Sequence, residues 1–367
     1  MHGRSHLIDN AELNYTFWQK IISMKAVHST SLRLSRRLGS WLNHVMILCA
    51  SLGLHHSAKD TVLSLDSSLL EASAPPRHGW AKPLWITLRP QQWIKNLFVL
   101  TPILFSQNLF TSGAMLKVFL AFLLFCLISS SVYLLNDMKD LEQDRLHPVK
   151  RQRPLASGAL GVRVAFWAML VLLVLGLAGG LILSDGFAQV LFVYWLLNLL
   201  YTLVLKHHVI LDVFAIAAGF VLRVIGGATV IPVEISSWLL ICTTMLALFL
   251  GFSKRRHELT LLKGDATNHR QVLGEYNPHF LDMMIGIVTS ITVLSYALYT
   301  VSEETIHKFQ TKGLLFTLPF VLYGIFRYLY LVYHKGQGGD PGLSLVTDLP
   351  TMVNFLLWAI TVVFVLY

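Results

Sequence analysis

The chain has 367 residues, of which 54% are hydrophobic and only 13% are charged, with a formal net charge of +9 and a mean hydropathy of +0.60. A soluble domain carries about a quarter charged residues, so this composition argues against an ordinary soluble protein and predicts a polytopic, all-α membrane protein. The positive charge comes without aromatic–basic alternation or a recognition-helix pattern, so we expect no nucleic-acid partner.

The first 79 residues differ in composition from the rest of the chain. They are rich in Ser and His, and residues 74–79 resemble a linker. The apolar stretch 45–54 is too short to span a bilayer, and no small-residue cleavage site marks a signal peptide. We expect residues 1–79 to form a flexible extension; a surface helix within it, or a start codon assigned too early, are the alternatives. The membrane domain is then expected over residues 80–367.

Nine apolar runs follow in this second part, and most approach the 17–25 residues that a transmembrane helix needs. They cover residues 94–112, 115–136, 164–184, 187–205, 209–231, 236–252, 280–300, 314–333 and 352–367. Alternate connections carry nearly all of the Lys and Arg residues, whereas the opposite ones contribute only Lys117, Lys308 and Lys312. By the positive-inside rule the N-terminus and the polar loops face the cytoplasm, as in a multi-pass protein of the inner (plasma) membrane.

A cluster of carboxylates stands directly after the second apolar run. Asp137, Asp140 and Asp144 follow Asn136 at spacings that place all three on one face of a helix. Clustered carboxylates at a membrane boundary need a compensating cation, and hard oxygen ligands suit Mg²⁺, which in turn holds a diphosphate. The basic run after them would bind the remaining phosphate charge; it contains Lys150, Arg151 and Arg153. The pattern predicts a metal–diphosphate site.

Further polar residues stand at the predicted cytoplasmic ends of other helices. They are Arg89, Lys95 and Asn96; Tyr201, Lys206, Asp212 and Arg223; Lys254, Arg255 and Glu258; and the Gly-rich segment 334–341 with Asp340. Each group also has an alternative interpretation. The cations near residue 89 could snorkel to the interface, Asp212 and Arg223 could pair with other helices, residues 253–258 could be a stop-transfer cluster, and residues 334–341 could be a plain loop. A pump or channel would scatter ionisable groups along a path through the membrane. Because these groups gather at one side, we favour an enzyme.

These motifs resemble the UbiA-type superfamily of membrane transferases, whose members have nine transmembrane helices and an Asn-Asp-x-x-Asp-x-x-x-Asp motif. The resemblance covers residues 80–367 and rests on several separate segments: 89–96, 136–158, 212–228 and 254–259. It implies a transferase with a Mg²⁺ site, in which Asp137, Asp140 and Asp144 are the catalytic metal ligands. The implied substrate-binding residues are Arg89, Lys95, Asn96, Asn136, Lys150, Arg151, Arg153, Tyr201, Lys206, Asp212, Arg223, Lys254, Arg255 and Glu258. Whether Asp340 and Asp348 join the site is left open.

Within the superfamily, the chain is more similar to the branch that acts on decaprenyl-like phosphates. That branch transfers 5-phosphoribosyl from phosphoribosyl diphosphate to the polyprenyl phosphate in the synthesis of cell-envelope glycan precursors. The prenyltransferase branch is expected to carry a second Asp-x-x-x-Asp motif, whereas residues 253–258 here are cationic.

Two alternatives stay open. One is a UbiA-type prenyltransferase that joins a polyprenyl diphosphate to an aromatic or glycerol-type acceptor, and the other is a lipid transporter without chemistry. The oligomeric state, a homo-oligomer included, cannot be read from the composition.

Overall fold

The computed structural model describes residues 79–367 except 108, 148, 232, 262–273, 337–341 and 343–346. The predicted extension over residues 1–79 therefore lies almost entirely outside the described residues, as does Asp340, and both expectations stay predictions. The described part is helical throughout and contains no strand. This confirms the predicted all-α fold.

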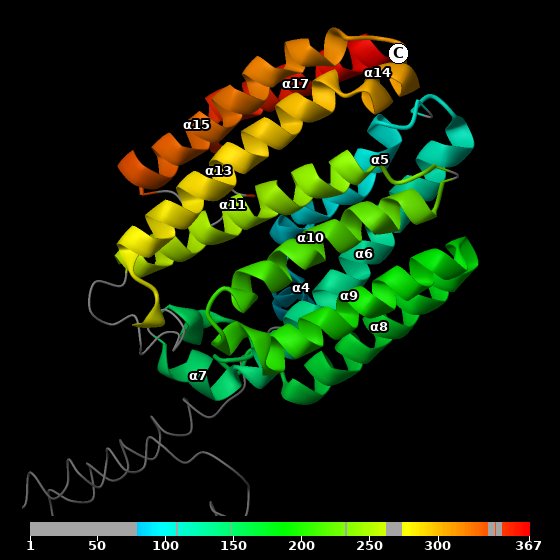
Figure 1. Ribbon diagram of the computed structural model, residues 1–367. Coiled ribbons are helices and arrows are strands. Elements are labelled where there is room, and N and C mark those ends of the chain that lie inside the picture. Colours follow the sequence, from blue (N-terminus) through cyan, green and yellow to red (C-terminus); the bar gives the residue numbers. More distant parts are fainter. Residues whose placement is uncertain are drawn as a thin grey trace, which may run out of the picture. The chain divides into compact units, whose positions relative to one another are not determined.

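Eight of the predicted spans are present as helices that are long and apolar enough to cross a bilayer. They are α6 (Ser112–Lys139), α8 (Val162–Leu183), α9 (Asp185–Leu203), α10 (Leu211–Thr229), α11 (Ser237–Leu261), α13 (Pro278–Val301), α15 (Leu318–His334) and α17 (Leu349–Leu366). The 3₁₀ turn η5 (Gly313–Thr317) leads into α15, and the short helix α14 (Glu303–Phe309) follows α13. The protein is a polytopic integral membrane protein (Figure 1).

The first predicted span, residues 94–112, differs from the expectation because it is not one continuous α-helix. After α4 (Ala81–Leu88), Arg89 takes a left-handed conformation, and the chain continues as the 3₁₀ helix η1 (Pro90–Leu100) and the short helix α5 (Thr101–Leu104). Pro102 has no N–H to offer the Phe98 carbonyl, which accepts instead from the backbone and the hydroxyl of Thr101. At the rise of each helix type, η1 and α5 together extend roughly 28 Å, close to the thickness of the hydrocarbon core.

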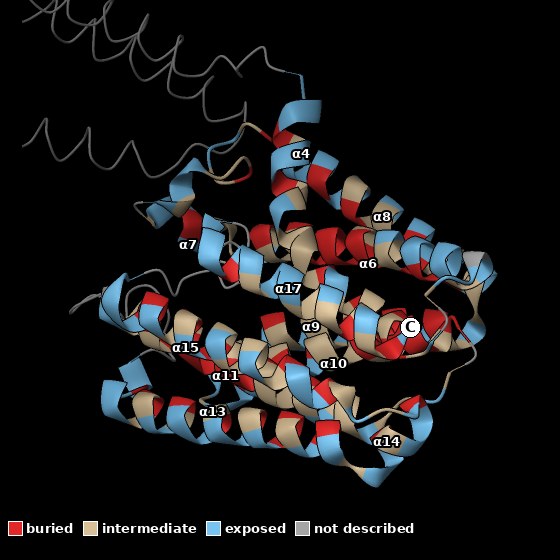
Figure 2. Cartoon of the chain, turned by 90° about the horizontal axis from the view of Figure 1, so that it is seen from above, coloured by how far each residue is buried: buried red, intermediate tan, exposed pale blue. Residues whose placement is uncertain are grey.

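The helix α10 lies in the middle of the bundle and contacts η1, α5, α6, α9 and α11. A Cβ at Gly227 of α10 would lie only 1.9 Å from the carbonyl oxygen of Val99, so glycine is what lets the backbone of η1 pack directly on α10. Buried apolar faces of α6, α9 and α10 meet η1 there, and a second core joins α10, α11, α13 and α15 (Figure 2).

Antiparallel packing brings the C-terminal ends of α6, α9, α11 and α15 together with the N-terminal ends of α10 and α13. Contacts between side chains of these segments define the end of the bundle that carries α7 (Leu141–Leu146). We call it the site end; it lies toward the lower left in Figure 1. The apolar spans thus place polar residues that are far apart in the sequence next to one another.

Candidate active site

The carboxylate cluster lies where α6 passes into α7. Asp140 separates the two helices, an interruption that the sequence spacing does not reveal. The helical hydrogen bonds nevertheless continue, because the Asp140 N–H donates to the Asn136 carbonyl at 2.9 Å and the Asp144 N–H donates to the Asp140 carbonyl at 2.8 Å. Asp137 and Asp144, two turns apart, therefore still lie on one side, as predicted.

Two arginines neutralise this pair of carboxylates. Arg153 Nη1 donates to Asp144 Oδ2 at 2.6 Å and to Asp137 Oδ1 at 3.2 Å, and Arg89 Nη2 donates to the same oxygen of Asp137 at 2.5 Å. Both carboxylates are only 3% exposed, whereas both arginines remain about 30% exposed. Two buried charges are thus held by cations that solvent and ligands can reach.

The third carboxylate has a different partner. Asp140 accepts from Lys206 Nζ at 2.7 Å, and Lys206 belongs to the short 3₁₀ turn η3 (Leu205–His207) after α9. Beside it, the Thr202 hydroxyl donates to Asn136 Oδ1. These two contacts join the end of α6 to the end of α9. The sequence places Asn136 with the Asp cluster but puts Lys206 only at the same predicted side of the membrane, so the contact between Lys206 and Asp140 is new.

The donor set fits a divalent cation that also binds substrate oxygens. Among the described residues, no three His, Cys, Asp or Glu side chains converge closely enough to hold a metal ion unaided. Asp137 Oδ1 and Asp144 Oδ2, however, can lie no more than 5.8 Å apart, because one nitrogen of Arg153 bonds both. Mg²⁺ is usually held by one or two carboxylates together with waters and phosphate oxygens. The position between Asp137 and Asp144, which Arg153 Nη1 occupies, therefore suits Mg²⁺.

A second cluster joins α10 and α11 at the same end of the bundle. Arg255 is 1% exposed and donates from Nε to Asp212 Oδ2 at 2.5 Å and from Nη1 to Glu258 Oε2 at 2.6 Å. Its Nη2 donates to the hydroxyl of Tyr201 at 3.4 Å, and Lys254 lies 3.9 Å from Glu258. The structure therefore unites five predicted site residues, but Arg255 and Asp212 are fully enclosed, so that of the five only Glu258, Tyr201 and Lys254 are accessible from outside the cluster.

Tyr276 completes this second cluster, although no sequence pattern points to it. Its hydroxyl donates to Asp212 Oδ1 at 2.8 Å and accepts the backbone N–H of Ile210 at 2.7 Å. Burial raises the pKa of the Tyr276 phenol above its usual value, and the hydrogen bond to Asp212 adds to the increase. The phenol therefore stays protonated as a donor. Nothing in its local sequence distinguishes it from an interfacial tyrosine.

Arg223 does not lie with either cluster. Eleven residues along α10 from Asp212, or about 16 Å, its guanidinium donates to Asn96 Oδ1, the Gly219 carbonyl and the Tyr194 hydroxyl, each at 2.8 Å. Asn96 in turn donates to Ser129 on α6 at 3.1 Å. Of the two interpretations of Arg223 and Asn96, the structure favours pairing between helices in the bundle interior over contact with a substrate at the site end.

Of the remaining predicted cations, Lys95 lies on η1, whereas Lys150 and Arg151 closely precede Arg153 in the sequence. Lys95 and Lys150 are half-buried, and Arg151 is exposed on the short turn η2 (Lys150–Gln152) that precedes Arg153. On α7, Arg145 pairs with exposed Glu142 at 2.9 Å, a surface contact apart from the buried carboxylates. The sequence does not decide whether Asp348 belongs to the site. In the structure Asp348 pairs with Arg327 at 2.8 Å and does not join either cluster.

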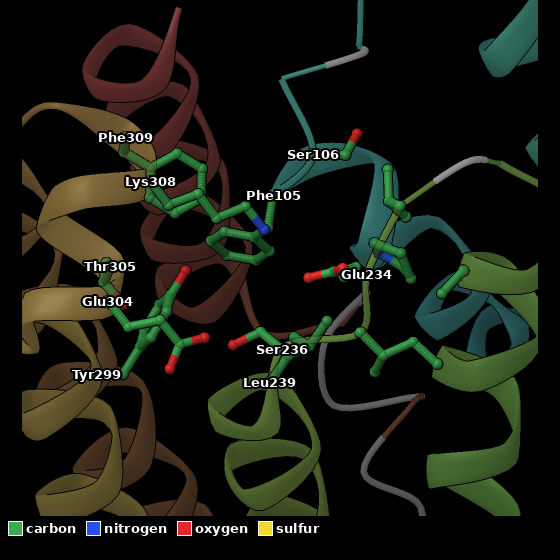
Figure 3. A pocket seen from close by; sticks show the side chains of 14 residues that line it. Phe105, Ser106, Glu234, Ser236, Leu239, Tyr299, Glu304, Thr305, Lys308 and Phe309 are labelled. Atoms are coloured by element: carbon green, nitrogen blue, oxygen red, sulfur yellow. The ribbon is translucent and has the colours of Figure 1, made fainter.

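A small pocket lies at the opposite end of the bundle and takes no part in this site. Its volume is about 20 Å³, room for little more than a water molecule. Figure 3 shows Glu234, Glu304 and Lys308 around it. Ala228, which also lines it, is sixteen residues, or about 24 Å, along α10 from Asp212.

The eight apolar spans define a polytopic membrane protein. Both clusters of candidate site residues lie at the same end of its bundle, and this end corresponds to one membrane surface. Residues 98–366 match the UbiA prenyltransferase family. The chain belongs to this family and is a membrane transferase.

Among its relatives, the decaprenyl-phosphate phosphoribosyltransferase of Corynebacterium glutamicum is 32% identical over 76% of this chain and 85% of its own length. The enzyme of the same name from Mycolicibacterium smegmatis is 31% identical, over 81% of this chain and 98% of its own. The nodulation protein NoeC of Azorhizobium caulinodans is 27% identical, over 76% and 92%.

Solved structures share the fold. A UbiA homologue from Archaeoglobus fulgidus, bound to GPP and Mg²⁺, has a TM-score of 0.59 at 20% identity and covers 77% of this chain and 99% of its own. The apo UbiA homologue from Aeropyrum pernix has a TM-score of 0.52 at 12% identity, covering 74% and 98%. At these identities the likeness establishes the architecture alone.

Proposed function

We propose that this protein transfers the 5-phosphoribosyl group of phosphoribosyl diphosphate to a polyprenyl phosphate and releases diphosphate, with Mg²⁺ bound at the carboxylate cluster. The reaction would supply a lipid-linked sugar for cell-envelope glycans. The proposal is supported by the relatives named as decaprenyl-phosphate phosphoribosyltransferases, which this chain matches over most of both lengths.

The single structural observation that carries the proposal is the excess of reachable cations around a buried carboxylate pair. Asp137 and Asp144 would hold Mg²⁺ with donor phosphate oxygens and water, and Asp140 is the further carboxylate at hand. Bound there, the metal would stabilise the charge that develops on the leaving diphosphate. Arg89 and Arg153, released from the carboxylates by the incoming cation, are placed to bind the phosphates of the same donor.

The transfer needs few other groups. A phosphate oxygen of the acceptor attacks C1 of the ribose as the bond from C1 to the diphosphate breaks, and the electron pair leaves with the diphosphate. The acceptor oxygen is already anionic, so no strong general base is required. Two half-buried lysines, Lys206 beside Asp140 and Lys254 in the second cluster, are the cations proposed for the ribose 5-phosphate and the acceptor phosphate.

The prenyltransferase alternative differs in where the diphosphate leaves from. An allylic diphosphate is usually held between two acidic clusters, and the second of these is expected near the end of α11. At that place Glu258 is held by Arg255 and neighbours Lys254, so the segment binds anions better than it binds a second metal ion. This favours a donor with a diphosphate and a separate phosphate.

We further infer that the site end faces the cytoplasm, where phosphoribosyl diphosphate is available. The inference rests on the Lys and Arg residues of the loops at this end, among them Arg145, Lys150 and Arg151, against the sparsely charged loops opposite.

A transfer assay tests the proposed function. Purified protein in detergent receives labelled phosphoribosyl diphosphate, a polyprenyl phosphate and Mg²⁺, and the label is followed into the organic phase. We expect Mg²⁺-dependent label in lipid that Asp137→Asn abolishes and that Glu142→Gln, at an exposed position of α7, leaves intact. Turnover of an allylic diphosphate by folded protein, without ribosyl transfer, would instead establish the prenyltransferase alternative.

A further inference from the structure

The turn at Arg89 presents a guanidinium of the candidate site on a strained backbone. Arg89 has a φ of 53° and a ψ of 60° between α4 and η1, in the left-handed region that residues with a Cβ seldom adopt. Glycine would adopt this conformation without strain, but it would lack the guanidinium that bonds Asp137. Such strain persists only where surrounding contacts enforce it, and it is concentrated at functional sites. The contacts that hold this turn are therefore candidates for a role in the site.

One buried hydroxyl on α6 binds the chain on both sides of Arg89. Ser130, which is 1% exposed, donates from Oγ to the carbonyl of Leu88, the last residue of α4, at 3.0 Å. The same oxygen accepts the indole N–H of Trp93 on η1 at 3.1 Å. The rings of Trp85 and Trp93 also meet edge to face across this turn, with centroids 5.8 Å apart. Because the hydroxyl serves as donor and acceptor at once, it ties the end of α4 to the first turns of η1 around the left-handed residue.

The same face of α6 leads from this hydroxyl to the carboxylates. Ser130, Tyr133 and Asp137 follow one another at i, i+3 and i+7. The guanidinium of Arg89 lies 5.0 Å from the ring centroid of Tyr133, a cation–π contact, and it bonds Asp137. A Mg²⁺ ion at the carboxylates would compete with Arg89 for Asp137 but would leave the turn and the ring contact in place. The guanidinium would then stay beside the metal, where a phosphate oxygen can accept its hydrogen bonds.

We propose that Ser130 is a positioning residue for the donor diphosphate, because the turn that it closes fixes the guanidinium of Arg89 where the diphosphate binds. Ser130 lies two turns of α6, or roughly 10 Å, from Asp137 and acts through the backbone at Arg89 without touching the substrate. Without the hydroxyl the left-handed turn is no longer enforced, so the guanidinium loses its fixed position and the diphosphate is bound less tightly. The ribosyl donor rests on the proposed function, whereas a bound diphosphate is common to this function and to the prenyltransferase alternative.

Binding of inorganic diphosphate tests this role without relying on transfer. The full chain in detergent with Mg²⁺ is titrated with diphosphate in a calorimeter. We expect Ser130→Ala to raise the dissociation constant about fivefold, part of the effect of losing one charge-assisted contact, and Ser130→Thr, which keeps the hydroxyl, to restore most of the affinity. Ser131→Ala is the matched control, because Ser131 is as buried as Ser130 but donates to Ile128 of its own helix at 2.7 Å. Equal effects of the two alanine variants, or no effect of either, would overturn the proposal.

A double-mutant cycle separates positioning from a general loss of structure. In an Arg89→Gln background Ser130→Ala has no guanidinium left to misplace, so its effect on diphosphate binding should disappear. If the loss of affinity persists in that background, Ser130 acts through the structure as a whole and the proposal fails. Trp93→Phe is the second variant should Ser130→Ala not fold, because it keeps an aromatic ring but removes the N–H that Ser130 accepts. It should weaken diphosphate binding in the same direction and show the same dependence on Arg89.

Steady-state kinetics connect this role to the proposed reaction. Ser130→Ala should raise the KM for phosphoribosyl diphosphate and leave the KM for polyprenyl phosphate unchanged, because the turn at Arg89 concerns the donor alone. A rise in the KM for the acceptor, without one for the donor, would contradict the proposal. A parent protein that binds diphosphate but transfers no ribose would overturn the proposed function and leave the role of Ser130 to the binding data. A parent protein that binds no diphosphate in the presence of Mg²⁺ would overturn the role of Ser130 itself.

Discussion

Asp137 and Asp144 lie on either side of one guanidinium nitrogen, Nη1 of Arg153, which bonds both carboxylates. A cation therefore occupies the space between the two buried acids even without substrate. A divalent metal would compete with Arg153 for this position, and the displaced guanidinium would be free for the phosphates that arrive with the metal.

Replacing either buried carboxylate should abolish transfer. Asp137→Asn or Asp144→Asn removes one negative ligand from the cation position, and we expect the rate to fall at least about 1000-fold, the order of effect that metal-assisted charge stabilisation provides. The assay is label transfer at saturating donor. Glu142→Gln is the matched control, because the Glu142 side chain is 82% exposed and forms a surface pair with Arg145. Normal activity of both Asn variants would eliminate the metal role.

Arg153→Gln should change metal and donor binding in opposite directions. Without the competing guanidinium, Mg²⁺ should bind the two carboxylates at lower concentration, because their negative charge is less compensated. The KM for the phosphate-bearing donor should rise about tenfold, since one charge-assisted contact is lost. Calorimetric titration with Mg²⁺ and steady-state kinetics measure the two effects. Weaker Mg²⁺ binding in this variant would show that Arg153 supports the metal site instead of competing with it.

The buried pair of Asp212 and Arg255 should dominate stability at the site end. Removing one partner leaves an uncompensated buried charge, so Asp212→Asn or Arg255→Met should each lower the free energy of unfolding by about 3–5 kcal/mol. The double variant should lose less than the sum of the two single changes, because neither charge is then left alone. Thermal unfolding in detergent gives the comparison. Additive losses would mean that the two side chains do not stabilise one another.

Much of the site was predictable because its parts lie close in sequence or on long apolar helices. Hydropathy located eight spans, and the i, i+7 spacing of Asp137 and Asp144 placed them on one side. Convergence of distant residues was not predictable: no local signal links Arg89 to Asp137, forty-eight residues away, or Tyr276 to Asp212. Arg223 shows the converse, since its spacing from Asp212 matched a common face, yet three neutral acceptors hold it in the bundle interior.

Acid should weaken the ion pair between Asp348, at the start of α17, and Arg327 of α15. Hydrogen bonds from Arg327, with help from Thr351, lower the pKa of Asp348 to about 2 from the usual 3.8. The folded state thus favours the ionised carboxylate, and its contribution to stability is complete above about pH 4 and is lost as the pH falls toward 2. We expect the unfolding temperature of the parent protein to fall more over this interval than that of Asp348→Asn. Parallel curves for the two proteins would contradict the ion pair.

The hydroxyl of Tyr276 should hold a strained turn in place at the start of α10. Ile210 has a φ of +69°, which costs a β-branched residue roughly 1–2 kcal/mol, and its N–H donates to Tyr276. Tyr276→Phe removes that acceptor and a donor to buried Asp212, so we expect the free energy of unfolding to fall by about 1–3 kcal/mol. Tyr323→Phe, at an exposed position of α15, should be nearly neutral.

Glycine tests the strain itself, because it adopts a positive φ at no steric cost. In an Ile210→Gly background the turn needs less support, so the cost of Tyr276→Phe should shrink by about 1 kcal/mol in a double-mutant cycle. Thermal unfolding of the four proteins provides the cycle. If the cost of Tyr276→Phe is the same in both backgrounds, Tyr276 acts through Asp212 alone and the conformation of Ile210 does not depend on it.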